Sequence, residues 1–155
     1  KNKNLYESLS AYGVGFHRHV SEIDQELKFI TKKKVNFIFT PHLTPMFRGI
    51  LSTIYVESKN KKSIHDFYRE LINFYRGKKF IIIKKIDSMI STNNVINTNN
   101  IQISVCKTKF KNKFIILSAI DNLIKGGAGQ AVQNMNIKYD FKINEGLKWK
   151  KYFSY

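Results

Sequence analysis

The 155-residue sequence contains little cysteine, little proline and no long apolar run. Its one cysteine, Cys106, cannot form an internal disulfide, so we expect a reducing, cytoplasmic compartment. The apolar run 80–83 ends at Lys84, far short of the ~20 residues of a membrane helix, so no membrane partner is expected. We also expect no secretory leader, because no charged and then apolar segment opens the sequence. A hydrophobic content of 43% excludes a disordered tail and suffices for one core.

Acidic residues and arginine are also scarce. The 27 Lys and Arg residues outnumber 11 Asp and Glu residues, which gives a net charge of +16, but only 4 of the basic residues are Arg. A basic nucleic-acid-binding module is one hypothesis, yet proteins that read phosphate and bases favour the fork of Arg. The 23 Lys, 15 Asn and 21 Ile residues all have AT-rich codons. Nucleotide bias therefore accounts for the charge, and we expect no nucleic-acid partner.

Hydrophobic periodicity predicts an α+β fold. Helices are expected over 21–33 with Ser21 as the N-cap, over 63–76, and within 121–138. Strands are expected over 35–40, 49–58, 79–85, 101–109 and 113–120, the last two as a hairpin, whereas 93–100 is expected to be a loop without core residues. Because several strands follow one another without crossovers, we predict a mixed, largely antiparallel sheet that helices cover on one face.

The whole chain, 1–155, is expected to form a single domain. Residues 122–155 are predicted to be its terminal helix and tail. In that tail Leu147, Trp149, Tyr152 and Phe153 would pack on a neighbour.

His17, Arg18 and His19 form the densest cluster of ionisable side chains. In an extended segment the two imidazoles project to one face and Arg18 to the other. Histidine can act as a general base near neutral pH, and arginine can hold a carboxylate or phosphate. Two ordinary, half-buried histidines are the alternative. No Cys or His spacing matches a zinc pattern, so no metal site is expected.

The segment 125–130 is rich in glycine. Closely spaced glycines allow backbone N–H groups to approach an anion at a helix N-terminus. The pattern is neither GxGxxG nor a Walker A motif, and the glycines equally suit close helix packing. Cys106 lies in a predicted strand and is interpreted as a core residue.

Three segments together resemble N-acetyl-gamma-glutamyl-phosphate reductases. Residues 17–23 (HRHVSEI) resemble the family's HRHxPEI, and residues 40–54 (TPHLTPMFRGILSTI) resemble its TPHLxPMxRGILxTI. Residues 121–136 (DNLIKGGAGQAVQNMN) resemble its DNLxKGAAGQAVQNxN. The matches keep the family's order and span about residues 12 to 147. Ser21 replaces the family's usual Pro, and Gly127 replaces an Ala.

The resemblance implies the C-terminal, substrate-binding and dimerisation half of that enzyme, with a fold similar to the C-terminal domains of glyceraldehyde-phosphate and semialdehyde dehydrogenases. The family reduces N-acetylglutamyl phosphate to the semialdehyde with NADP in arginine biosynthesis. Its N-terminal half supplies a Rossmann cofactor domain and a nucleophilic cysteine, and neither motif occurs in this sequence. We therefore expect the isolated chain to be inactive without that missing domain, whether it is an excerpt, half of a split enzyme or a decaying gene product.

The resemblance also implies roles for individual residues. His19 is the first choice for the general base, and His17 is the second. The residues implied to anchor the acyl phosphate substrate are Arg18, Arg48 and His42. The residues implied to lie beside NADP, or NAD, are Gly126, Gly127, Ala128, Gln130 and Asn134. The strands are implied to pair subunits into a dimer or tetramer, and a non-catalytic interaction subunit with the same surface is the alternative.

Overall fold

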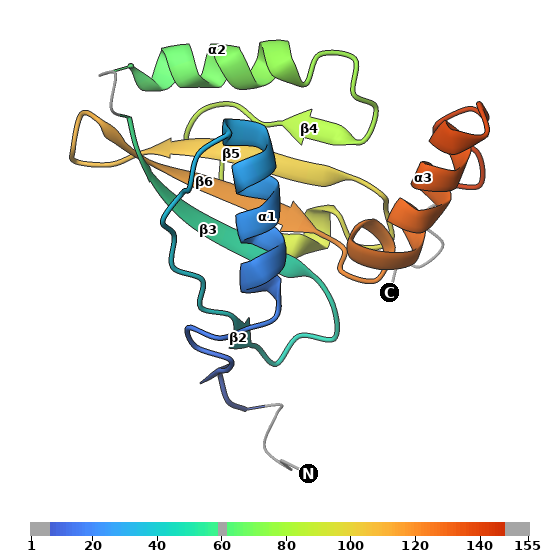
Figure 1. Ribbon diagram of the computed structural model, residues 1–155, viewed down its shortest axis with the longest axis horizontal. Helices are drawn as coiled ribbons and strands as arrows, with labels where there is room; N and C mark the ends of the chain where they lie inside the picture. The colour runs from blue at the N-terminus through green and yellow to red at the C-terminus, as the bar shows by residue number, and fades with distance from the viewer. Residues whose placement is uncertain (1–6, 59–61, 148–155) are drawn as a thin grey trace. The chain divides into compact units, whose positions relative to one another are not determined.

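The computed structural model describes residues 7–58 and 62–147 (Figure 1). The chain divides into two compact units at the boundary between Phe47 and Arg48. The single domain expected from the sequence stays a prediction, and each unit is described by itself. Trp149, Tyr152 and Phe153, which were predicted to pack on a neighbour, lie outside the described residues. No helix of the described part is both long and apolar enough to cross a membrane.

Over its described residues, 7–47, the first unit contains one helix and a pair of two-residue strands. Strand β1 (Ser10–Ala11) pairs antiparallel with β2 (His42–Leu43), and helix α1 (His19–Thr31) lies between them in sequence. The helix begins two residues before the predicted start, and its N-cap is Arg18 in a helical conformation. The prediction of Ser21 as the N-cap is therefore wrong. The Ser21 hydroxyl instead donates to the Arg18 carbonyl at 2.8 Å, a local bond that serine makes inside a first turn.

The strand predicted over residues 35–40 is also wrong, because these residues pair with no strand in the described part of the chain. The run is rich in β-formers, but β-propensity reflects packing against neighbouring strands rather than an intrinsic backbone preference. Pro41 follows it directly and cannot donate to a ladder.

The second unit is built on a four-stranded sheet in the order β3-β6-β5-β4. Its strands are β3 (Ile50–Glu57), β4 (Ile81–Ile83), β5 (Ile101–Lys107) and β6 (Lys113–Ile120). The predicted β5–β6 hairpin is confirmed, and β3 pairs antiparallel with β6 over eight residues. The sheet is mixed, as predicted, because β4 and β5 are parallel, and parallel neighbours need a crossing connection.

Helix α2 (Ile64–Phe74) lies over one face of this sheet (Figure 1). Ile64 is buried in one cluster with Val105 of β5 and Phe114 of β6, and Phe67 stacks on Phe114 with ring centroids 6.1 Å apart. Ser63 begins the helix with a capping box in which Asp66 is the second member. The predicted mixed, largely antiparallel sheet with a helix-covered face is confirmed.

The connection from β4 to β5 corrects a further expectation. It contains the 3-10 helix η1 (Thr92–Asn94), and Val95 behind it is 0% exposed while Asn99 is 1% exposed. The prediction of a loop without core residues is therefore wrong. Ser91 caps the short helix, since its hydroxyl accepts from the N–H of Asn93 at 3.2 Å.

The C-terminal part of the described chain is helical. A π-helical segment, η2 (Ile124–Ala128), leads into α3 (Gly129–Lys138). Gly127, near the end of η2, has non-helical backbone angles of φ −152° and ψ −116° and so kinks this segment just before α3.

Candidate functional site

The predicted site residues fall into two groups, one in each unit. The group in the first unit is centred on His17. Its ring lies 4.7 Å from the ring of His19 and 5.2 Å from that of Tyr12, both edge to face, and 5.5 Å from that of Phe39. The sequence predicted that the two imidazoles share a side, and they do. They do so at a helix start rather than in an extended segment, because Arg18 is helical.

The two histidines differ in what holds them. Nδ1 of His17 accepts a bond from the backbone N–H of His19 at 3.2 Å, so this nitrogen is an acceptor and its ring orientation is fixed. The imidazole of His19 makes no hydrogen bond within the described ranges, 7–58 and 62–147, and both of its nitrogens are left for proton transfer. Arg18 is exposed, and His42 is exposed where β2 pairs with Ala11.

The group in the second unit is centred on Asp121, which is 0% exposed. Nη2 of Arg48 lies 2.7 Å from Oδ1 and 2.6 Å from Oδ2 of this carboxylate. The backbone N–H groups of Leu123 and Ile124 donate to Oδ1 at 2.9 and 3.0 Å, and that of Asn97 donates to Oδ2 at 2.8 Å. The structure therefore brings Arg48, which was predicted to anchor the substrate, together with an aspartate to which the sequence analysis assigned no role.

Asp121 is ionised at neutral pH. Burial by itself would raise the pKa of its carboxyl, but the Arg48 guanidinium and the three backbone N–H groups outweigh burial and hold the pKa below its usual value. The side chain of the next residue, Asn122, also binds the segment before β3, since its Oδ1 accepts from the N–H of Gly49 at 2.7 Å.

The glycine turn, residues 126–128, starts one helical turn after Asp121. Gly126, Gly127 and Ala128 are exposed. Nε2 of Gln130 donates to Oδ1 of Asn134 at 2.8 Å along α3. The five residues implied to lie beside the cofactor thus belong to two consecutive elements, η2 and α3.

Gly129 shows that close packing accounts for one of the glycines. An added Cβ at this residue would lie 2.5 Å from Cγ2 of Ile124 and 2.6 Å from Oδ1 of Asn99. The packing alternative is therefore supported at Gly129, whereas Gly126 and Gly127 are exposed and their part in anion binding stays a prediction.

A polar network behind this turn was missed from the sequence. Oε1 of Gln133 accepts from Nδ2 of Asn99 and from Nζ of Lys125, each at 2.9 Å. Lys125 also lies over the Phe80 ring at 5.4 Å, and burial lowers the pKa of its amine. Nothing in the sequence distinguishes buried Asn99 from the exposed asparagines of the same Asn-rich loop.

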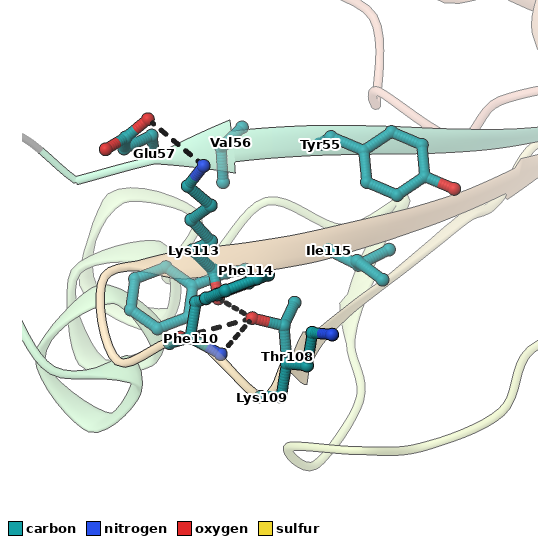
Figure 2. A pocket seen from close by; sticks show the side chains of 9 residues that line it. All are labelled: Tyr55, Val56, Glu57, Thr108, Lys109, Phe110, Lys113, Phe114 and Ile115. Carbon is teal, nitrogen blue, oxygen red and sulfur yellow. Dashed lines mark hydrogen bonds and ion pairs between the residues drawn. The ribbon is translucent and has the colours of Figure 1, made fainter.

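A shallow hollow of about 450 Å³ lies elsewhere in the second unit, at the far end of the β3–β6 ladder (Figure 2). Tyr55 and Ile115 line it from the strands, and Phe110 lines it from the β5–β6 turn. Asp121 follows the opposite end of this ladder, about 24 Å away along the strand. The hollow contains no predicted site residue. Within the described ranges, no group of three or more His, Cys, Asp or Glu side chains is placed to hold a metal.

The fold is that of semialdehyde dehydrogenases. The aspartate semialdehyde dehydrogenase of Francisella tularensis has a TM-score of 0.69 with this chain at 15% identity, over 87% of this chain and 40% of its own. Residues 1–122 match the family described as "Semialdehyde dehydrogenase, dimerisation domain", and the chain belongs to this family.

Curated relatives agree with the resemblance found in the sequence. An N-acetyl-gamma-glutamyl-phosphate reductase of Staphylococcus aureus (strain MRSA252) is 42% identical over 144 residues, which cover 93% of this chain and 42% of the relative. The protein of the same name from Clostridium botulinum (strain Alaska E43 / Type E3) is 45% identical over 141 residues, 91% of this chain and 41% of the relative. The chain thus spans less than half the length of these relatives.

Proposed function

We propose that this chain is the substrate-binding and dimerisation half of an NADP-dependent N-acetyl-gamma-glutamyl-phosphate reductase of arginine biosynthesis. The observation that carries the proposal is the identity of 42% and 45% with two proteins of that name, over more than nine tenths of this chain. The paired histidines and the glycine turn support it, because they fall in the segments whose motifs resemble the family's. The complete reaction requires the part of the enzyme that this chain does not span.

In the proposed reaction the acyl phosphate becomes an aldehyde and inorganic phosphate leaves. When bound, the nicotinamide cofactor supplies the hydride, and the nucleophilic cysteine is expected in the missing half. The residues of this chain move the proton and bind the anionic substrate. His19 is the proposed general base, because its imidazole is held only by ring contacts, whereas Nδ1 of His17 is occupied by a backbone N–H.

Three side chains are proposed to bind the anionic groups of the substrate. Arg18 presents an exposed guanidinium next to the two imidazoles in sequence, and His42 is exposed on β2. Arg48 uses Nη2 for Asp121, which leaves Nη1 of the fork for a carboxylate or phosphate.

The glycine turn fits a nicotinamide cofactor. Gly126, Gly127 and Ala128 are exposed and carry no side chain beyond a methyl group, so a flat ring can approach their backbone. Gln130 and Asn134 continue this surface with amide groups. We propose that this stretch holds the nicotinamide end of the cofactor, with NADP rather than NAD taken from the resemblance.

Activity of a completed enzyme tests the proposal. The part of the Staphylococcus aureus relative that this chain does not span is joined in front of this chain, and NADP-dependent reduction of N-acetylglutamyl phosphate, or its reverse, is assayed. We expect activity, and we expect His19→Asn to lower kcat by about 100-fold or more. The matched control is His65→Asn, which changes an exposed histidine of α2.

Two results would contradict these assignments. A correctly assembled and inactive chimera would favour the non-catalytic interaction subunit. An unchanged kcat in His19→Asn, together with a large loss in His17→Asn, would move the role of general base to His17.

A further inference from the structure

One buried carboxylate joins three segments that are distant in sequence. Asp121 is the only charged side chain that is wholly buried within residues 7–58 and 62–147. Its partners come from the corner before β3, from the β4–β5 connection and from the start of η2. Burying a charge is costly unless it is paired and hydrogen-bonded, and a fully satisfied buried polar network makes the structure around it more rigid.

The two carboxylate oxygens of Asp121 accept hydrogen bonds from different segments of the chain. Oδ1 accepts from the N–H groups of Leu123 and Ile124, which are the residues that open η2. The backbone carbonyl of Asp121 also accepts from Gly126 at 3.0 Å, so this residue sets both ends of the first turn. Oδ2 ties that turn to Asn97.

Arg48 is oriented by the same carboxylate. A single nitrogen, Nη2, lies within 2.7 Å of both oxygens, so the ion pair leaves Nη1 unused. Nε of Arg48 is buried and has no hydrogen-bond partner in the described part of the chain. Asp121 is therefore the hydrogen-bond partner of the guanidinium among the described residues, and Asn122 holds the adjoining Gly49 backbone.

We infer that Asp121 is a positioning residue that acts through Arg48 on the substrate and through η2 on the cofactor. The inference rests on the proposed function, and it concerns a residue whose side chain reaches neither ligand itself. Its structural basis is that one carboxylate orients a proposed substrate anchor and begins the glycine turn proposed to hold the nicotinamide.

Hydrogen exchange on the present chain tests the structural half without any activity. Asp121→Asn keeps the shape and one acceptor oxygen, but its NH2 group faces Nη2 of Arg48 and, depending on the amide orientation, either the N–H of Asn97 or those of Leu123 and Ile124. We expect amides of residues 123–129 to exchange at least about tenfold faster, because charge-assisted bonds are lost. Amides of α2 and of the β3–β6 ladder are expected to keep their rates.

Asp87→Asn is the matched control both for hydrogen exchange and for the kinetics of the completed chimera. Asp87 also accepts a backbone N–H, from Lys107 at 2.8 Å, and pairs with the Lys107 ammonium at 3.3 Å. It is half exposed and lies outside the proposed site, so its substitution is expected to change neither the exchange of 123–129 nor the kinetics.

Kinetics of the completed chimera test the functional half. A residue that is merely structural lowers the folded fraction and therefore the apparent kcat, whereas a positioning residue raises KM in enzyme that is fully folded. We expect Asp121→Asn to raise KM at least about fivefold for both the acyl phosphate and the cofactor. Arg48→Lys keeps the carboxylate and its three N–H bonds, so only the KM of the substrate is expected to rise.

The outcomes separate this inference from the proposed function. Equal acceleration of exchange over the whole second unit, or unchanged KM values in folded Asp121→Asn, would overturn the inference in a chimera whose parent is active. If Asp121→Asn does not fold, the kinetics of Arg48→Lys are the test. An unchanged KM for the acyl phosphate in that variant overturns the inference. If the parent chimera is inactive the proposed function fails, and the exchange experiment still decides whether Asp121 holds the turn.

Discussion

Individual buried residues show how tightly the second unit is packed around its C-terminal helix. Gly129 opens α3 with ordinary helical angles of φ −66° and ψ −36°, so backbone freedom does not explain the glycine. The contacts of a would-be Cβ with Ile124 and Asn99 explain it. The space that a methyl group would need is already filled by the side chains of η2 and the β4–β5 connection.

Gly129→Ala is therefore expected to destabilise the protein by about 1–3 kcal/mol, the cost of overpacking a filled interior. The control is Gly126→Ala, since its Cβ would meet nothing closer than Cδ1 of Ile120 at 3.4 Å. Chemical denaturation of both variants measures the difference in unfolding free energy. Equal stability of the two variants would show that α3 can shift to make room.

The sequence predicted which side chains of the candidate site lie together better where they are close in the chain. His17 and His19 are two residues apart, so their neighbouring imidazoles follow from short-range geometry. Asp121 and Asn97 meet across 24 residues of chain, and no local pattern marks that bond. The same holds for Asn99, because burial of an asparagine is decided by what packs over its loop.

At the scale of elements, the two helix starts show when a serine followed three residues later by an aspartate is a reliable N-cap signal. Ser63 accepts the N–H of Asp66 at 3.2 Å, while Asp66 accepts the N–H of Ser63 at 3.2 Å. The sequence correctly placed the start of α2 at this serine. Ser21 has the same acidic spacing but lies inside α1, because the helix continues back to His19.

These two serines make a matched pair. Ser63→Ala is expected to cost about 1 kcal/mol, the typical value of an N-cap, and to lower Tm by a few degrees. Ser21→Ala removes only a hydroxyl bonded to the Arg18 carbonyl, so it is expected to change stability by less than about 0.5 kcal/mol. Thermal unfolding of both variants checks the contrast, and a larger loss in Ser21→Ala would restore the serine as a cap.

Strands were predictable where alternation and a short connection occur together, as in the β5–β6 hairpin. The parallel pairing of β4 with β5 was not predictable, because the connection between them contains only the short helix η1 and not the long helix that usually indicates a crossover. The run 35–40 has strand composition and no strand partner, which shows that pairing is a property of neighbours. Local pattern thus determined most elements and left their adjacency open.

The second unit, taken as a whole, leaves part of its sheet uncovered. Val56 packs in the α2 cluster, so its neighbour Tyr55 points to the opposite face, where Tyr55 is 78% exposed and Leu51 is 49% exposed. Exposed apolar side chains on a folded sheet mark an interaction surface. The family is described as a dimerisation domain, which supports a homo-oligomer.

We expect the chain to form dimers through the face that carries Tyr55. Tyr55→Glu is expected to raise the dimer Kd at least about tenfold, since a buried aromatic anchor carries much of such an interface. Phe74→Glu is the control, because Phe74 is 75% exposed on α2 over the other face. Sedimentation velocity across a concentration series measures both. Equal weakening by the two substitutions would place the interface elsewhere.

The Arg48–Asp121 ion pair also has a genetic consequence. The arginine codons AGA and AGG become lysine codons by a single G-to-A change, and both aspartate codons become asparagine codons in the same way. A composition rich in Lys and Asn, such as the 23 Lys and 15 Asn residues of this chain, is what such changes produce. Where Arg48 is encoded by AGA or AGG, the pair that holds the glycine turn is one transition from loss at either partner. Drift in such a gene is expected to disable the site before it unfolds the sheet.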